Sequence, residues 1–325
     1  MREMRIGKND SGQRLDKFLS KALPSLPPSL LYKSVRTKKI KVNRKRAEAG
    51  QLLAEGDTLQ LFLADDFFPA EQSSPKSPDL GKIRPGLDIV YEDDNILLLN
   101  KRPGVTVHED EEGQDNTLIL HVQAYLFQKG EYRPEEEQSF APALCNRIDR
   151  NTGGLVIAAK NAEALREMNA IIKERQIRKY YLCAVHGIPV PRQAVLTGYL
   201  MKNPRDNMVS VFDAPRKEAK VIKTGYRLLA SSGDLALLEV ELFTGRTHQI
   251  RAHLSHIGHP LLGDGKYGIN KSDKANGYKY QALWAYKLSF VPNGNVSLLS
   301  YLGGKTFRVP EDKIYFLSLF PTYRF

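Results

Sequence analysis

Apolar residues in the first 64 positions recur in short patterns that predict a small unit of helices and strands. Two stretches repeat apolar residues at the spacing of a helix face, the second directly after the turn-forming pair Pro27-Pro28. Segments 39–42 and 58–63 alternate polar and apolar residues, as half-buried strands do. The helical patterns are carried by Leu15, Phe18 and Leu19 and then by Leu30, Leu31 and Val35.

From residue 86 onward, apolar runs of strand length recur with helical patterns between them. Segments 161–175 and 247–257 predict helices, the first capped by Asn161 and the second ended by Gly258 and Pro260. The strands do not alternate strictly with helices, so the pattern favours an α+β fold with a mixed, largely antiparallel sheet flanked by helices. The predicted strands are 96–100, 155–160, 180–185, 235–243 and 283–290.

The stretch from 65 to 85 interrupts these patterns. It holds four prolines and three serines, with little that a core could bury. Such a composition is typical of a linker. We therefore predict a small domain over residues 1–64, a linker over 65–85 and a larger domain over 86–325.

The composition excludes several protein classes. With 325 residues, 42% hydrophobic and 26% charged, the chain has the make-up of a globular protein. Its apolar runs are far shorter than the roughly 20 residues that a membrane span needs. The charged N-terminus has no apolar stretch of the kind that marks secretion, and two cysteines make no disulfide framework. We expect a protein of the reducing cytoplasm that does not contact a membrane.

Positive charge is concentrated at one end of the chain. The net charge is +11, and residues 1–63 hold 14 Lys and Arg against 6 Asp and Glu, which gives +8. Eight basic residues and no acidic one lie from Lys33 to Arg46, a segment called here the basic stripe. A solvated face kept soluble by charge is one interpretation, but a localised stripe favours a polyanion such as nucleic acid. The candidate RNA contacts are Lys33, Arg36, Lys38, Lys41, Arg44, Lys45 and Arg46.

One carboxylate stands out in the segment 146–154. Asp149 lies between Arg147 and Arg150, just before a Gly-Gly pair that leads into the apolar run 155–160. Flanking arginines would keep this carboxylate ionised, which suits a nucleophile or a base. The glycines would let a ligand approach the backbone closely. A surface ion pair on a turn explains the same residues equally well.

A second unusual segment is 244–251, with the sequence TGRTHQIR. A strand end, a glycine turn and a helix start carry Thr, His and Arg, a combination suited to an anion or phosphate. Arg246 and Arg251 could reach a phosphate or a partner carboxylate. The alternative is a capped helix with exposed charges. Four of the seven histidines lie between His248 and His259, but without an HExxH pattern or a Cys pair we expect no metal site.

These two segments carry a resemblance to a known family. The chain is similar to the pseudouridine synthases of large-subunit ribosomal RNA, whose motif H-R-L-D-R-x-T-S-G corresponds to residues 146–154. The similarity extends through 89–108, 178–187 and 244–268. Residues 13–63 resemble the S4 RNA-binding domain that precedes the catalytic domain in many members. The resemblance thus covers most of the chain outside the linker.

The resemblance implies an isomerisation of uridine in RNA. The N-glycosidic bond is broken, the uracil turns, and C5 is joined to the ribose, with no cofactor or metal. Asp149 corresponds to the catalytic carboxylate, which either attacks the ribose or removes its 2′ proton. Arg251 corresponds to the arginine that pairs with this aspartate, and Tyr181 to the tyrosine that stacks on the base. The implied substrate contacts are Arg147, which helps to flip the nucleotide, together with Arg246, His248 and Asn146.

Three positions depart from the family pattern. Asn146 stands where His is usual, Ile148 where Leu is usual, and Gly153 where Ser is usual. None of them touches Asp149 or its expected partners, so we expect catalysis to be retained while the substrate loop differs.

Two other functions compete with this one. The first is a non-catalytic RNA-binding assembly factor, for which an intact catalytic set is unnecessary. The second is an N-glycosidase, which would pair Asp149 with a second carboxylic acid. The partner that we expect is structured RNA, ribosomal in preference to transfer RNA, bound by a monomer.

Overall fold

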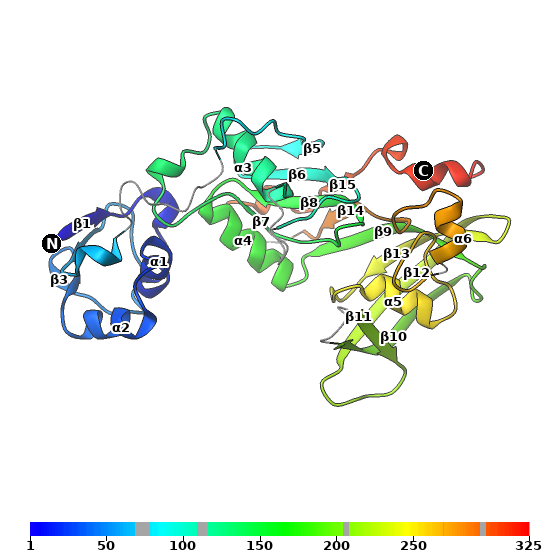
Figure 1. Cartoon of the computed structure of the whole chain (residues 1–325), viewed down its shortest axis with the longest axis horizontal. Coiled ribbons are helices and arrows are strands. Elements are labelled where there is room, and N and C mark those ends of the chain that lie inside the picture. Colours follow the sequence, from blue (N-terminus) through cyan, green and yellow to red (C-terminus); the bar gives the residue numbers. More distant parts are fainter. Residues whose placement is uncertain (69–78, 109–115, 204–207, 269, 293–296, 325) are drawn as a thin grey trace. The chain divides into compact units, whose positions relative to one another are not determined.

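The computed structural model describes residues 1–68, 79–108, 116–203, 208–268, 270–292 and 297–324 (Figure 1). Their contacts divide the chain into two compact units. The first takes in residues 1–85, 120–143 and 159–166, and the second residues 86–119, 144–158 and 167–325. The middle of the predicted linker, residues 69–78, lies outside the described residues.

The first unit contains the predicted small domain. Helices α1 (Leu15–Ala22) and α2 (Pro28–Arg36) each bury an apolar face, in which Phe18 and Leu31 are almost fully enclosed. Both predicted helices and both predicted strands are confirmed. The four-stranded sheet has the order β1-β4-β2-β3, in which β1 and β3 were not predicted. Its strands are β1 (Arg2–Arg5), β2 (Ile40–Val42), β3 (Lys45–Arg46) and β4 (Thr58–Leu61).

Polar contacts join this domain to later parts of the same unit. The Ser139 hydroxyl donates to Asp10 at 2.6 Å and accepts from Gln13 at 2.7 Å, and Asn9 donates to Glu137 at 2.6 Å. Segment 120–143 therefore belongs to the first unit. The domain boundaries predicted from the sequence placed it in the larger domain, 86–325.

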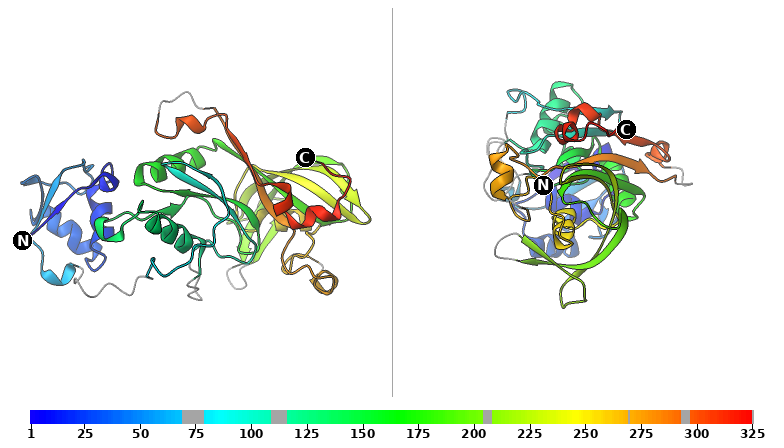
Figure 2. Two further views of the ribbon diagram at one scale, coloured as in Figure 1. Left: turned by 90° about the horizontal axis from the view of Figure 1, so that it is seen from above. Right: turned by 90° about the vertical axis from the view of Figure 1, so that its right-hand side faces the viewer.

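The second unit is built on a mixed sheet. Its strand order is β11-β10-β12-β13-β9-β14-β8-β6-β5, with β15 beside β14 and β7 beside β8. Strands β14 and β8 run parallel, whereas β9 through β13 are joined by antiparallel pairs, as the predicted fold class requires. Figure 2 shows how strongly these long strands twist. Their bounds are β5 (Ile89–Glu92), β6 (Ile96–Lys101), β7 (Ala143–Leu144), β8 (Gly153–Ala159), β9 (Ile177–His186), β10 (Gln193–Asn203), β11 (Met208–Phe212), β12 (Lys220–Ser232), β13 (Leu235–Leu242), β14 (Leu283–Phe290) and β15 (Thr306–Arg308).

Helices α5 (Gln249–His256) and α6 (Asn270–Ala275) belong to the second unit, whereas α3 (Leu118–Gln128) lies mostly in the first unit and α4 (Ala162–Lys173) is divided between the two. Asn161 caps α4 as predicted, because its side-chain oxygen accepts the Ala164 N–H at 2.8 Å. Helix α5 contacts β10, β11 and β12 (Figure 1) and thereby buries one face of that part of the sheet. None of the helices in the described ranges is long and apolar enough to cross a membrane.

The glycine pair before β8 serves packing between strands. A Cβ on Gly153 would lie 2.4 Å from the Trp284 ring, and one on Gly154 would lie 2.3 Å from the Ala285 carbonyl oxygen. These residues are register partners in the parallel pair of β8 and β14. The prediction that the glycines admit a ligand is therefore wrong, because β14 occupies that space.

A buried histidine of α5 is expected to make the fold sensitive to acid. His253 is 2% exposed, its Nδ1 lies 3.0 Å from the Thr224 hydroxyl, and burial lowers its pKa to about 4. In the unfolded chain its pKa is about 6.5. The unfolded state therefore takes up a proton first as the pH falls, so stability is fully present above about pH 6.5 and declines toward about pH 4.

We expect the variant His253→Gln to be less sensitive to pH than the parent chain. Between about pH 7 and about pH 5 it should lose on the order of 1–2 kcal/mol less stability. Urea unfolding at the two pH values measures this difference. An equal loss in both proteins would show that His253 takes no part in the acid sensitivity.

Candidate active site

Asp149 lies on a tight turn that precedes β8. The Thr152 N–H closes the turn on the Asp149 carbonyl at 3.0 Å. The buried ammonium of Lys101 donates to the carbonyl of Arg150 at 2.8 Å and to that of Val105 at 2.9 Å. These bonds tie the turn to the loop after β6. The side chain of Asp149 stays 27% exposed, so a substrate can reach it.

The cation in contact with Asp149 is Arg251, which lies 102 residues later in the chain. Its Nη1 is 3.1 Å from Asp149 Oδ2, and its side chain is 7% exposed. Arg251 belongs to α5 and lines the pocket. The structure thus brings together the two residues that the resemblance pairs, with a buried guanidinium against the carboxylate.

A second carboxylate holds Arg251 from the other side. Asp264 is fully buried, and its two oxygens accept from Arg251 Nε at 2.7 Å and Nη2 at 2.8 Å. Burial alone would raise the pKa of Asp264, but the bonds from Arg251 and from the Lys266 and Tyr267 amides hold it below its usual value. Asp264 therefore stays ionised and fixes the direction of the guanidinium. The sequence did not identify Asp264 as part of the site. The available signal was an aspartate within the glycine-rich turn 263–268.

Tyr181 comes from β9 and is 8% exposed at the wall of the pocket. Burial, together with the charge of Asp149, raises the pKa of its phenol above the ordinary value. The ring is therefore neutral and offers an apolar face rather than a base. Tyr180 points to the opposite face of the strand, as predicted. The Lys287 ammonium lies 4.1 Å from the centroid of its ring.

His248 lies beside this pair at the start of α5. Its Nε2 is 3.9 Å from Asp149 Oδ2, and its Nδ1 is 2.9 Å from the Tyr267 hydroxyl. Burial, reinforced by the positive charges of Arg251 and Lys266, lowers its pKa to about 4 in spite of Asp149. His248 is therefore neutral near neutral pH.

A pocket of about 250 Å³ opens over Asp149. That volume lies near the lower end of the roughly 300–1,000 Å³ of ligand pockets and suits one small group such as a flipped base. Arg147 and Arg246 are exposed along its lining, where a phosphate could meet them. Its lining also includes Lys179, whose pKa burial lowers. All seven predicted catalytic and substrate residues line it: Asn146, Arg147, Asp149, Tyr181, Arg246, His248 and Arg251.

Asn146 bonds to the backbone of β8. Its side-chain oxygen accepts the Ile157 N–H at 2.8 Å, and its amide nitrogen donates to the Leu155 carbonyl at 3.4 Å. These bonds give the side chain a structural task at the position where the family usually has His. Contact between Asn146 and substrate stays a prediction.

Lys101 is the other residue near the site that sequence reasoning missed. It is 1% exposed, and burial lowers its pKa to about 7 against the attraction of Asp149. A lysine that follows Asn100 after the apolar run at the start of β6 was the available signal.

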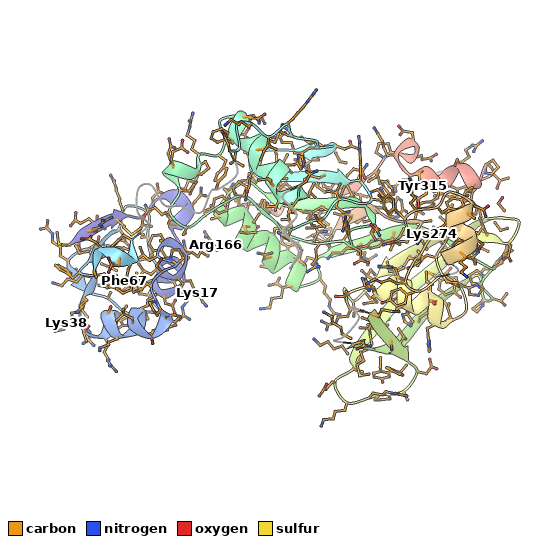
Figure 3. All side chains as sticks on the ribbon, in the orientation of Figure 1. Lys17, Lys38, Phe67, Arg166, Lys274 and Tyr315 are labelled. Carbon is orange, nitrogen blue, oxygen red and sulfur yellow. The ribbon has the colours of Figure 1, made fainter. Side chains whose placement is uncertain are left out.

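The basic stripe belongs to the first unit, on the end of α2 and on β2, β3 and the turn between them. Lys41 is half-buried and the other six predicted contacts are exposed; Figure 3 labels Lys38 on this surface. Arg44 adopts the left-handed conformation (φ 65°), and its N–H bonds to Gln60 at 2.8 Å, so the tip of the hairpin is fixed by the fold.

Comparison with known proteins agrees with this geometry. A family model described as RNA pseudouridylate synthase matches residues 95–256, and an S4 domain model matches residues 13–59. An uncharacterised RNA pseudouridine synthase of Mycoplasma genitalium is 32% identical over 88% of both chains. The ribosomal large subunit pseudouridine synthase C of Vibrio cholerae is 31% identical over 90% of this chain and 87% of its own.

A solved structure shows the same fold. The human RNA pseudouridylate synthase domain containing 4 protein superposes with a TM-score of 0.55 at 22% identity, over 71% of this chain and 92% of its own. The fold class and the family resemblance drawn from the sequence are thereby confirmed.

Proposed function

The chain belongs to the RNA pseudouridylate synthase family, and we propose that it isomerises specific uridines of ribosomal RNA with Asp149 as the catalytic carboxylate. The observation that carries the assignment is the contact of Asp149 with the buried Arg251 at a pocket of nucleobase size. Attack on the ribose and removal of its 2′ proton both need an ionised carboxylate. Because Arg251 contacts Oδ2, the other oxygen, Oδ1, is left to react.

The remaining residues have complementary tasks. The neutral ring of Tyr181 supports the flipped base by stacking, and Arg147 and Arg246 meet the phosphates on either side. The uracil is detached, turns and is rejoined through C5; C5 releases its proton and N1 gains one, so the composition of the nucleoside is unchanged. A buried wall that excludes water protects the detached base from loss.

Within the part of the chain that the structure describes, folding supplies a second carboxylate beside Asp149, but it is not the acid that an N-glycosidase requires. Asp264 is the carboxylate beside the pair of Asp149 and Arg251, and both its oxygens accept hydrogen bonds from Arg251. A fully buried carboxylate held ionised cannot protonate a leaving group. The geometry therefore favours isomerisation over hydrolysis.

The proposed substrate is ribosomal because the similar protein of Vibrio cholerae is named for the large ribosomal subunit and because an S4 domain precedes the catalytic domain. The basic stripe would hold RNA through its phosphates and position the target without selecting its sequence. We propose further that the protein acts as a monomer in the cytoplasm.

Mapping pseudouridines by carbodiimide modification and primer extension tests this function. RNA from cells that lack the gene should miss one or more pseudouridines, and treatment with the purified protein should restore them. Restored sites in transfer RNA instead would reassign the substrate. Release of free uracil would indicate a glycosidase, and bound but unmodified RNA would indicate an assembly factor.

The basic stripe makes a separate prediction about salt. Replacing Lys38, Lys41 and Arg44 together with Gln should weaken RNA binding and reduce the slope of log affinity against log salt by about 2. Filter binding over a salt series measures the slope. A control variant with Lys173, Lys217 and Lys313 replaced carries the same change of charge in the second unit. Equal slopes for the two triple variants would rule out the stripe as the RNA contact.

A further inference from the structure

The Tyr267 hydroxyl connects the catalytic pocket to the β10–β11 hairpin. It accepts the Val209 N–H of β11 at 2.9 Å and lies 2.9 Å from His248 Nδ1. The two rings meet edge to face, with centroids 5.6 Å apart. Tyr267 belongs to the turn that also carries Asp264, so one short segment holds both Arg251 and His248.

These contacts fix which nitrogen of His248 carries the hydrogen. A tyrosine hydroxyl has one hydrogen to donate, and the Val209 N–H already occupies part of its accepting capacity. Donation to His248 Nδ1 satisfies the hydroxyl and makes Nδ1 an acceptor. In a neutral imidazole the hydrogen then resides on Nε2.

The Asp149 carboxylate favours the same tautomer. His248 Nε2 faces Asp149 Oδ2 at 3.9 Å. A hydrogen on Nε2 is attracted by the carboxylate, whereas a lone pair there would be repelled by it. Two independent contacts, one at each ring nitrogen, therefore select one tautomer.

The backbone of His248 supports a role in positioning. His248 is in the left-handed conformation (φ 53°, ψ 17°), which non-glycine residues adopt rarely and at an energetic cost. Its carbonyl accepts the Ala252 N–H at 2.9 Å as α5 begins. This conformation directs the imidazole toward Asp149, and the bond to Tyr267 holds it there.

We propose that Tyr267 is a positioning residue that holds His248 as the Nε2–H tautomer, so that His248 presents an N–H donor to the bound nucleotide and is not the base of the reaction. The role in the reaction rests on the proposed function, whereas the tautomer itself does not. The low pKa of His248 agrees with a neutral ring. Its N–H lies where it can donate to an oxygen of the ribose or of the uracil beside Asp149. The proton that leaves C5 must then go to a group other than His248.

Nitrogen NMR of protein labelled with ¹⁵N-histidine tests the tautomer directly. The variant His248→Asn, which removes one set of signals, identifies those of His248. Near neutral pH we expect them to show a protonated Nε2 and an unprotonated Nδ1. In Tyr267→Phe the Nδ1–H form should become populated. In the control Tyr226→Phe, which removes a hydroxyl bonded to the Pro191 carbonyl, the His248 signals should not change.

Two results would overturn the assignment. One is a wild-type His248 that carries hydrogen on Nδ1 or on both nitrogens. The other is a tautomer that stays the same in Tyr267→Phe. Neither measurement depends on turnover, so the tautomer is tested even if the enzyme proves to have another activity.

Kinetics tests the role in the reaction. Tyr267→Phe should lower kcat about tenfold while KM for RNA changes little, because the hydroxyl is beyond the nucleotide and acts through His248. His248→Gln retains an N–H donor and should keep more activity than His248→Leu. Equal loss in the Gln and Leu variants, or an unchanged kcat in Tyr267→Phe, would refute the donor role.

Discussion

Replacement of Asp149 by Asn is expected to lower turnover by at least about 10³-fold while RNA binds with nearly unchanged affinity. The amide has nearly the shape of the carboxylate, but it has no negative charge with which to attack the ribose or accept its 2′ proton. The RNA contacts are spread over the pocket rim and the basic stripe, so the loss falls on kcat and not on binding.

The fold is expected to survive this substitution. Asp149 is 27% exposed, so it can lose its charge without leaving a sealed cavity. Arg251 keeps two hydrogen bonds to the buried Asp264, so its charge stays paired. A loss of activity in Asp149→Asn therefore reports on the reaction rather than on unfolding.

Single-turnover formation of pseudouridine at a mapped site measures the effect. The control Asp94→Asn makes the same change of charge at an exposed turn in the same unit and should retain full turnover. Turnover of Asp149→Asn within a few-fold of the parent would disprove the catalytic assignment.

Asp149 stood out as a candidate in the sequence because its signals are local. Asp149, its flanking arginines and the apolar run that became β8 lie within 15 residues of one another. Helices such as α1 and α4 were equally readable, since the apolar faces of both follow one period and α4 begins directly after its cap, Asn161. Local patterns therefore singled out Asp149 as a candidate and framed the fold.

The partners of Asp149 were beyond a local pattern. The flanking arginines suggested that the charge is held by neighbours, but the cation in contact comes from α5. The residues alone suggested that Arg251 could reach a partner carboxylate, and only the family resemblance paired it with Asp149. Nothing anticipated that Asp264 would hold Arg251 or that Tyr267 would hold His248. Such pairings depend on how β13, α5 and the following turn pack, which residue spacing does not encode.

The strands β10 and β12 were missed because apolar residues lie on both of their faces. In β10, Val195 is 55% exposed whereas Leu200 is buried. In β12, Val221 is 54% exposed whereas the next residue, Ile222, is buried. Apolar side chains on the outer face erase the alternation that marks a half-buried strand. The prediction for Gly153 and Gly154 was wrong for a related reason. These glycines pack against β14, which is distant in sequence.

Replacement of the buried Asp264 should mainly lower the free energy of unfolding, whereas replacement of Asp149 should mainly lower turnover. Asp264→Ala leaves the Arg251 guanidinium buried without its bidentate partner. Breaking a buried ion pair on one side costs about 3–5 kcal/mol of stability. It also releases the Lys266 and Tyr267 amides, which bond to Asp264 at 2.9 and 3.1 Å. We expect a large loss of folding free energy, and a loss of turnover as Arg251 leaves Asp149.

Urea unfolding of Asp264→Ala, Asp264→Asn and Asp149→Ala separates charge from shape. Asp264→Asn keeps acceptors for the backbone amides, so it should cost less than Asp264→Ala. Asp149→Ala should cost no more than about 1 kcal/mol, because its partly exposed pair with Arg251 contributes little. If Asp264→Ala proved as stable as Asp149→Ala, the buried guanidinium would have found another partner or water. Arg251 would then owe its position to the packing of α5 rather than to Asp264.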